Sequence, residues 1–167
     1  SGNTRVNDEV IRRELAVYPG QLYSRELLMY SLRQITGMGH FNPENLQPDI
    51  KPVSSDLVDI SFPLEEQASD QFNIAGGWGS GSFVGSVGIT LNNLSTRNLF
   101  KKGTWSPYPM GQNQKLSISG QTNGTYYKAL SVSFTDPWVG GRKPNSLSVS
   151  AHWSEQNNAY YIWQTAT

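Results

Sequence analysis

The sequence predicts an α+β domain over residues 1–67, followed by the first antiparallel strands of a transmembrane β-barrel over residues 68–167. The charge balance changes at this boundary, because the first part holds 6 Lys and Arg against 10 Asp and Glu, and the second holds 7 against 3. The spacing of apolar residues also changes there, from helical periodicity to alternation. The 16 glycines and 11% aromatic residues, with only 16% charged residues, are typical of a β-rich chain with tight turns.

Two helices are expected near the N-terminus. Asn7 is a suitable N-cap for the first helix, which must end before Pro19. Ser24 is a suitable N-cap for the second helix, and Gly37 and Gly39 offer left-handed positions after it. The apolar faces comprise Val10, Ile11 and Leu15 in the first helix and Leu27, Leu28, Leu32 and Ile35 in the second.

Two strands should follow these helices. A weak strand is expected near Pro48 to Pro52, a turn at Ser54-Ser55-Asp56, and a second strand within Leu57 to Glu65. Two helices need a sheet of more than two strands to cover them. We therefore expect one more strand before Thr4, which this sequence lacks.

The second part alternates between apolar and small polar residues in segments of about nine to eleven residues, the length that crosses a bilayer when tilted. Strands of soluble sandwiches are more often about five to six residues long. The alternation therefore favours barrel strands. The apolar sets are Phe83, Val87, Ile89 and Leu91; Leu116 and Ile118; Leu130, Val132 and Phe134; and Leu147, Val149, Ala151 and Trp153.

Aromatic residues gather at the ends of these segments, where barrels carry girdles that contact the membrane interface. The candidate membrane-interface residues are Trp78, Tyr126, Tyr127, Trp138 and Trp153, and further aromatic residues at segment ends are Trp105, Tyr108, Tyr160, Tyr161 and Trp163. Because small closed barrels have about eight strands, the strands predicted here require others outside this sequence.

No group of residues indicates catalysis, a metal or a cofactor. Cysteine is absent, and His40 and His152 stand far apart. Glu65 and Glu66 would point to opposite sides of a strand, so we expect solvated charges there rather than a carboxylate pair. The glycine-rich segment 76–81 does not match nucleotide-binding spacings. The sequence predicts a protein that is not an enzyme and has no cofactor, metal site or nucleic-acid partner.

Two pairs of cations remain. Arg12 and Arg13 lie on the first expected helix and should be solvated. Lys101 and Lys102 lie in a loop, where they could contact lipid headgroups. That loop, residues 95–113, is longer than expected for a short turn between barrel strands.

Motifs in the first part resemble a POTRA repeat. They are Gly2-Asn3-Thr4-Arg5, Val10-Ile11-Arg12-Arg13-Glu14-Leu15, Pro19-Gly20-Gln21-Leu22-Tyr23-Ser24, Gly37-Met38-Gly39-His40-Phe41 and Val58-Asp59-Ile60. The order in that family is strand, helix, helix, strand, strand, and a Gly-Asn pair normally follows the first strand. The absence of that strand here agrees with a chain that begins inside the repeat.

The second part resembles the start of the barrel in the BamA family of outer-membrane protein assembly factors. The stretches that carry this resemblance are residues 72–79, Asn92-Asn93-Leu94 and residues 131–138. The resemblance implies the last POTRA repeat followed by about five of about sixteen barrel strands. It also implies a barrel in the cell outer membrane and an N-terminal domain in the periplasm.

The function implied by this resemblance is the folding and insertion of β-barrel proteins into the outer membrane. The first barrel strand would serve as a lateral-gate template, because its glycines weaken pairing and its open edge could capture a substrate strand. Implied partners are nascent outer-membrane proteins, accessory lipoproteins or other subunits of an assembly complex, and outer-membrane lipid. The expected gate edge consists of Gln71, Phe72, Asn73, Ile74, Ala75, Gly76 and Gly77.

Two alternatives remain open at this level. A two-partner secretion transporter also joins POTRA domains to a barrel, and it would move a polypeptide through a pore. A soluble β-rich module could instead bind carbohydrate or protein through exposed Trp and Tyr side chains. A protein that stays folded and monomeric without detergent would favour the soluble module.

Overall fold

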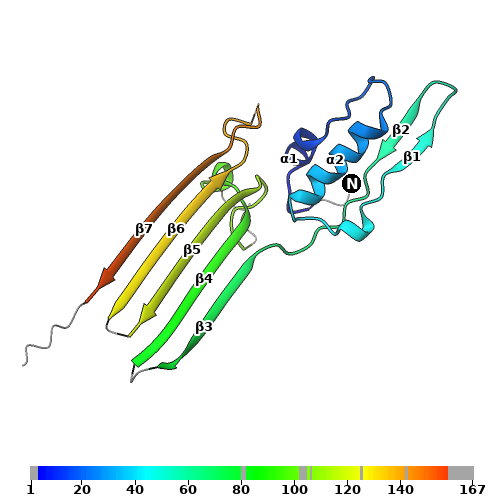
Figure 1. Cartoon of the computed structure of the whole chain (residues 1–167). Helices are drawn as coiled ribbons and strands as arrows, with labels where there is room; N and C mark the ends of the chain where they lie inside the picture. Colours follow the sequence, from blue (N-terminus) through cyan, green and yellow to red (C-terminus); the bar gives the residue numbers. More distant parts are fainter. Residues whose placement is uncertain are drawn as a thin grey trace, which may run out of the picture. The chain divides into compact units, whose positions relative to one another are not determined.

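The computed structural model of the protein describes residues 4–79, 82–101, 105, 107–124, 126–141 and 143–157. It divides into two compact units, Ser1–Asp70 with Leu91–Lys115, and Gln71–Thr90 with Leu116–Thr167. The first unit contains the helices and a two-stranded sheet, and the second contains most of a five-stranded sheet (Figure 1). The fold is an α+β domain followed by an antiparallel sheet of long strands, as the sequence predicts.

Helix α1 spans Asp8–Glu14, and helix α2 spans Arg25–Gly37. Ser24 caps α2 as predicted, because its Oγ accepts a hydrogen bond from the N–H of Leu27 at 3.4 Å. Asn7 differs from the expectation, since its side chain caps nothing and its backbone N–H donates instead to the carbonyl of Gly111. The core between the helices and the following segments comprises Val6, Val10, Ile11, Ile35, Phe41, Leu46 and Leu64.

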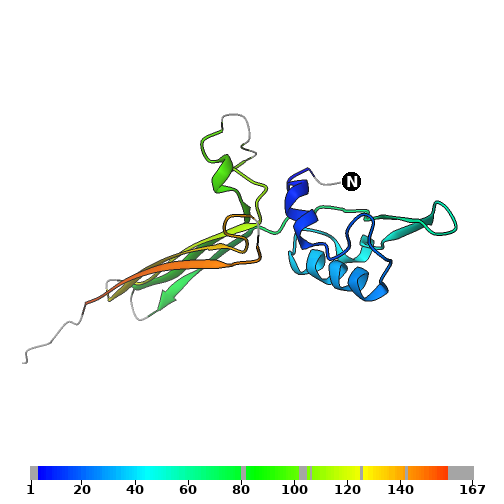
Figure 2. The ribbon, with the colours of Figure 1, turned by 90° about the horizontal axis from the view of Figure 1, so that it is seen from above.

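The two-stranded sheet consists of β1, Asp49–Pro52, paired antiparallel with β2, Val58–Ser61. The hairpin extends beyond the helices of its unit in both views (Figures 1 and 2). Strand β2 ends earlier than the predicted segment, and Val58 stays 43% exposed. Leu64, which follows the strand, is buried instead. The domain core therefore lies beside the base of the hairpin rather than along it.

The five-stranded sheet is a meander in the order β3-β4-β5-β6-β7. Figure 2 shows these strands as one layer. Their lengths, 9 to 13 residues, agree with the predicted bilayer-crossing segments. The strands are Gln71–Gly79, Ser82–Leu94, Gln114–Asn123, Tyr127–Asp136 and Leu147–Gln156.

The strand register confirms the predicted separation of apolar and polar faces. Directly opposite residues share one face of a sheet. On one face of β3 and β4, Phe72 pairs with Ile89 and Ile74 with Val87. On one face of β6 and β7, the pairs are Leu130↔Trp153, Val132↔Ala151 and Phe134↔Val149, and the other face carries Ser131↔His152, Ser133↔Ser150 and Thr135↔Ser148.

None of the described helices is both long enough and apolar enough to pass through a membrane.

Candidate functional site

Strand β3 lies at an edge of the five-stranded sheet. Among the described strands it pairs only with β4, in continuous register from Gln71↔Thr90 to Gly79↔Ser82. All seven predicted gate residues therefore belong to one edge strand, and each of them is exposed. The side chains of Phe72 and Ile74 are 71% and 85% exposed. The structure thus combines an unpaired backbone edge with large exposed apolar side chains.

One aromatic ring covers the glycines in the middle of this hairpin. Gly76 and Gly85 are cross-strand partners, and the ring of Phe83 lies over both. A Cβ atom would lie 2.8 Å from the Phe83 ring at Gly76 and 2.6 Å from it at Gly85, both too close for carbon atoms. Trp78 contacts the same ring edge-on, with the centroids 6.2 Å apart. A Cβ at Gly77, in contrast, would have no neighbour within 4 Å.

The predicted membrane-interface aromatics lie in different surroundings. Trp78, Tyr126 and Trp153 are 81%, 50% and 54% exposed, whereas Tyr127 and Trp138 are half-buried. Their contact with lipid stays a prediction. Of the further aromatics, Trp105 is exposed, Tyr108 bonds to Asp70, and Tyr160, Tyr161 and Trp163 lie outside the described residues.

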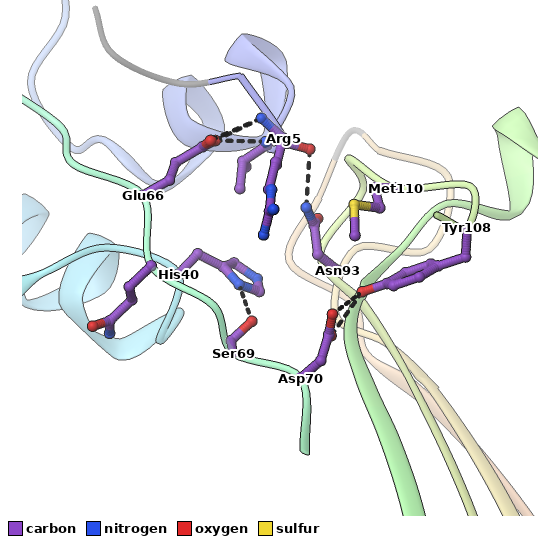
Figure 3. Close-up of a pocket in the computed structure, with 10 residues that line it drawn as sticks. Arg5, His40, Glu66, Ser69, Asp70, Asn93, Tyr108 and Met110 are labelled. Carbon is purple, nitrogen blue, oxygen red and sulfur yellow. Dashed lines mark hydrogen bonds between the residues drawn. The ribbon is translucent and has the colours of Figure 1, made fainter. Parts of the chain in front are cut away.

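A polar cluster joins the β4–β5 connection (residues 95–113) and the end of β4 to the α+β domain (Figure 3). We call it the junction cluster, and its residues are Arg5, His40, Glu66, Ser69, Asp70, Asn93, Tyr108 and Asn113. Asn93, only 5% exposed, lies at its centre. Its Nδ2 donates to the carbonyl of Arg5 at 2.9 Å, and its Oδ1 accepts from the N–H of Asn113 at 3.1 Å. Its own carbonyl accepts from the N–H of Gly111 at 3.0 Å. The side chain therefore bonds two segments that are far apart in the sequence.

Glu66 holds the N-terminal segment in the junction cluster. Its carboxylate accepts a hydrogen bond from Thr4 Oγ1 at 2.7 Å. It also accepts from the N–H groups of Arg5 and Val6 at 2.8 Å each, and Figure 3 shows Glu66 beside Arg5. Partial burial raises the pKa of Glu66, but these donors outweigh it and the net pKa is lowered. The expected solvated charge pair is therefore wrong for Glu66, whereas Glu65 is exposed and its carboxylate accepts a hydrogen bond from the side-chain amide of Asn45.

His40 is 2% exposed and links the chain before β3 to the end of the β4–β5 connection. Its Nδ1 lies 2.9 Å from Ser69 Oγ, and its Nε2 lies 2.7 Å from Asn113 Oδ1. A neutral ring satisfies both contacts, because Nε2–H donates to the amide oxygen and Nδ1 accepts from the hydroxyl. Burial is the main influence on this ring and lowers the pKa of His40.

Tyr108, in the β4–β5 connection, contacts the segment just before β3 through its side chain. Its hydroxyl donates to the Asp70 carboxylate, at 2.7 and 2.8 Å from the two oxygens. Burial first, and then this carboxylate, raise the pKa of Tyr108. The cavity between these residues measures only about 20 Å³, which is room for about one water molecule. The junction cluster is therefore built for structure rather than for holding a ligand.

Further contacts attach the β4–β5 connection to α1 and to its N-cap residue, and one of them is an ion pair between Arg97 and Glu9 at 3.6 Å. Arg13 differs from the expectation of a solvated side chain, because it is 9% exposed and its Nη2 donates to the carbonyl of Gln112 at 3.2 Å. Arg12 is exposed, as expected, and pairs with Asp8. Gly111 has a φ of +120°, and a Cβ there would lie 2.8 Å from the Asn7 side chain. Only glycine fits at that position.

Sequence reasoning identified β3 but missed the junction cluster. His40, Asp70, Asn93, Tyr108 and Asn113 are scattered over more than 70 positions, and no spacing connects them. The single available signal was the unusual length of the β4–β5 connection. Elsewhere, His152 lies on the polar sheet face, where its Nδ1 is 2.8 Å from Ser131 Oγ. Across the described ranges, no three His, Cys, Asp or Glu side chains gather as metal ligands would.

Comparison with known proteins agrees with this architecture. Residues 1–67 match the family model described as "POTRA: Surface antigen variable number repeat". The chain is 29% identical over 141 residues to the outer membrane protein assembly factor BamA of Neisseria meningitidis, covering 83% of this chain and 15% of that protein. It is 26% identical over 145 residues to a putative outer membrane protein assembly factor of Treponema pallidum, covering 84% of this chain and 15% of that protein.

A solved structure shares the fold. The crystal structure of BamA from Haemophilus ducreyi lacking POTRA domains 1–3 matches with a TM-score of 0.67 at 22% sequence identity, over 95% of this chain and 27% of that one. The chain spans about 15% of the length of the curated relatives. The chain therefore has the fold of a POTRA domain followed by β-barrel strands, residues 1–67 match the POTRA family model, and the relatives named above are outer membrane protein assembly factors.

Proposed function

We propose that this chain contributes to the folding and insertion of β-barrel proteins into the outer membrane, with β3 as the lateral-gate strand that templates substrate strands. The relatives named above are assembly factors, which favours assembly over two-partner secretion. The observation that carries the gate role is the pair of adjacent glycines, Gly76 and Gly77, in the first strand of the sheet. Among the described strands β7 is also an edge strand, but it contains no glycine.

The chemistry of β3 suits such a role. Each unpaired backbone group at a sheet edge in lipid costs several kcal/mol, so an added strand is bound readily. Main-chain pairing is largely independent of the sequence of the added strand, which suits many substrates. Gly76 and Gly77 reduce the packing and raise the backbone entropy of the strand, so its existing pairing is easier to release.

The remaining roles follow from the same proposal. Residues 1–67 would lie in the periplasm and residues 68–167 would begin the barrel, with Trp78, Tyr126, Tyr127, Trp138 and Trp153 near the membrane interface. Partners would be nascent outer-membrane proteins and other subunits of an assembly complex, including accessory lipoproteins. We infer a non-catalytic role, since the titratable groups of the junction cluster are engaged in structural hydrogen bonds.

Proline substitution tests the template. Asn73→Pro and Ala75→Pro each remove a backbone donor from β3, so both should reduce assembly of outer-membrane proteins in cells. Assembly is measured as the folded fraction of a pulse-labelled barrel substrate. Folding of the variants is checked by their heat-modifiable migration in gels. Normal assembly with both proline variants would refute the gate role.

Site-directed cross-linking tests the same contact directly. The chain has no cysteine, so Asn73→Cys introduces a single thiol within it. A stalled substrate carrying a cysteine in its terminal strand should form a disulfide at Asn73. The matched control is Ser119→Cys in β5, an inner strand of the sheet. Cross-linking that is equal at both positions, or absent at Asn73, would contradict templating by β3.

A further inference from the structure

The β4–β5 connection exposes a small apolar tip. It begins after the 3₁₀ turn η2, Thr96–Asn98, and it includes Leu99, Phe100 and Lys101. Leu99 is 42% exposed and Phe100 is 91% exposed, and Trp105 further along the connection is 54% exposed. Exposure of such large apolar groups in water is unfavourable, so the tip indicates a contact with another apolar environment.

The base of this tip is fixed by hydrogen bonds. Ser95 is fully buried, and its N–H donates to the carbonyl of Pro109 at 2.8 Å. The side chain of Asn98 donates to the carbonyl of Met110 at 3.0 Å, and the N–H of Thr96 donates to Gln114 Oε1 at 2.7 Å. The tip is therefore presented on an ordered turn rather than on a loosely attached loop.

The sequence around the tip is basic, although one of its cations is paired, because Arg97 Nη1 lies 3.6 Å from Oε2 of Glu9 in α1. From Gln71 to Thr135 the sequence contains no Asp or Glu, and its cations are Arg97, Lys101, Lys102, Lys115 and Lys128. Aromatic and aliphatic side chains beside lysine are the composition of segments that lie in the headgroup layer of a membrane. Each cation near an anionic membrane surface strengthens binding by roughly five-fold.

The position of the connection in the fold agrees with this composition. It follows Leu94, the last residue of β4, and precedes Gln114, the first residue of β5. Within the sheet unit β4 ends at Thr90 and β5 begins at Leu116, and strands of bilayer-crossing length reach the lipid headgroups at their ends. The connection therefore starts and ends within a few residues, along the chain, of the expected bilayer surface.

We propose that the β4–β5 connection is a membrane-surface anchor, in which Leu99, Phe100 and Trp105 enter the headgroup layer of an anionic phospholipid bilayer and Lys101 contacts lipid phosphates. The junction cluster transmits this contact to the α+β domain, because Asn93 and His40 bond the two ends of the connection to that domain. The proposal rests on the barrel strands and does not depend on the gate role of β3.

A spin label measures the depth of the tip. The full-length protein with Phe100→Cys as its only cysteine is labelled and reconstituted into vesicles of phosphatidylethanolamine and phosphatidylglycerol. Collision rates with oxygen, which concentrates in lipid, and with a water-soluble nickel chelate are then measured. The matched control is Leu22→Cys, because Leu22 is 92% exposed on the α+β domain, outside the connection.

The label at Phe100 should collide several-fold more with oxygen, and several-fold less with nickel, than the label at Leu22. Nickel access equal to that at Leu22 would overturn the proposal. Shielding from both reagents would also overturn it, because that result indicates a protein partner. High oxygen and low nickel collision rates at both positions would mean that the tip is not specifically the anchor, and this result would overturn the proposal as well.

Charge reversal tests the contact with phosphates. In the labelled protein, Lys101→Glu should lower the oxygen-to-nickel ratio at position 100 several-fold in vesicles containing phosphatidylglycerol. Lys128→Glu, which changes an exposed cation at the start of β6, should leave the ratio unchanged. Equal effects of the two substitutions, or no effect of Lys101→Glu, would refute the phosphate contact and with it the anionic anchor.

Discussion

At the scale of single residues, buried polar groups of the first unit have the most specific roles. Asn93 and His40 are 5% and 2% exposed, and each bonds segments that are distant in the sequence. Removing one partner of such a bond leaves the other buried without a partner, which costs about 1–3 kcal/mol. These residues therefore stabilise one arrangement of the β4–β5 connection on the α+β domain.

Glu66 and its neighbour Glu65 form a matched pair for a test. The Glu66 carboxylate accepts hydrogen bonds at both oxygens, whereas a glutamine amide would have an NH₂ group in place of one of them. Glu66→Gln should therefore lower the stability of the α+β domain by about 1–3 kcal/mol. Glu65 is exposed, and Glu65→Gln should change stability by less than about 0.5 kcal/mol. Hydrogen exchange at the N–H groups of Arg5 and Val6 measures both effects.

The pH dependence of Glu66 has a defined sign. Its pKa is lowered by folding, so its contribution is fully present above the ordinary value of 4.5 and is lost as pH falls through the folded value. The protection factors of the Arg5 and Val6 N–H groups, which compare their exchange with the intrinsic rate at each pH, should therefore begin to fall below about pH 4.5 in the native protein. Glu66→Gln should not respond to pH in this way, and an identical response in that variant would contradict the assignment.

His40 should make the junction cluster sensitive to mild acid. Because burial lowers its pKa in the folded protein, its contribution is complete above the ordinary value of 6.5 and is lost as pH falls through the folded value. The protection factor of the Asn113 N–H, which compares its exchange with the intrinsic rate at each pH, should fall below about pH 6.5. His40→Gln cannot take up a proton, so this dependence should disappear in that variant.

At the scale of elements, the β3–β4 hairpin depends on the fit of one ring against two glycines. Gly76 and Gly85 face Phe83, whereas Gly77 has open space. None of these three glycines has a positive φ among the described residues, so backbone conformation does not require glycine there. Packing explains Gly76 and Gly85, and only Gly77 is free to take a side chain without a contact.

Alanine at the two adjacent glycines should have opposite effects. Gly76→Ala places a methyl group against the Phe83 ring and should destabilise the hairpin by about 1–3 kcal/mol. Gly77→Ala should stabilise the hairpin by about 0.5–1 kcal/mol, because alanine lowers the backbone entropy of the unfolded chain and causes no clash in the folded hairpin. Unfolding of the full-length protein in detergent measures both. Phe83→Ala should abolish the penalty at Gly76, and a penalty that persists in the double variant would contradict this explanation.

At the scale of the whole molecule, the exposed apolar surface of the sheet is the dominant physical feature. Phe72, Ile74, Val87, Val149 and Trp153 are each at least 51% exposed. A soluble protein rarely leaves such a continuous apolar surface uncovered. Lipid on that side of the strands, which the proposed barrel would supply, would account for this exposure.

A requirement for detergent or lipid follows from this surface. The full-length protein should sediment as a single folded species in detergent and should aggregate when detergent is removed, because the apolar face then meets water. Analytical ultracentrifugation, with circular dichroism for strand content, measures this. A folded monomer without detergent would support the soluble binding module considered from the sequence.

The sequence by itself determined the elements and their faces. Strict alternation from Phe83 to Leu91 and from Leu147 to Trp153 fixes which side chains share a face, because successive residues of a strand point to opposite sides. The Ser24 cap likewise follows from local chemistry. Val58 shows the limit of such patterns, since a strand-like spacing there does not produce a buried face.

Only the tertiary structure decided how distant segments meet. The junction cluster joins Arg5, His40, Asn93 and Asn113 through single hydrogen bonds, and a hydrogen bond between distant residues leaves no periodic signal in the sequence. The burial of Arg13 and the multiple donors on Glu66 likewise depend on segments that folding brings together. Local patterns therefore determined the strands and helices, whereas the attachment of the β4–β5 connection to the α+β domain depended on long-range contacts.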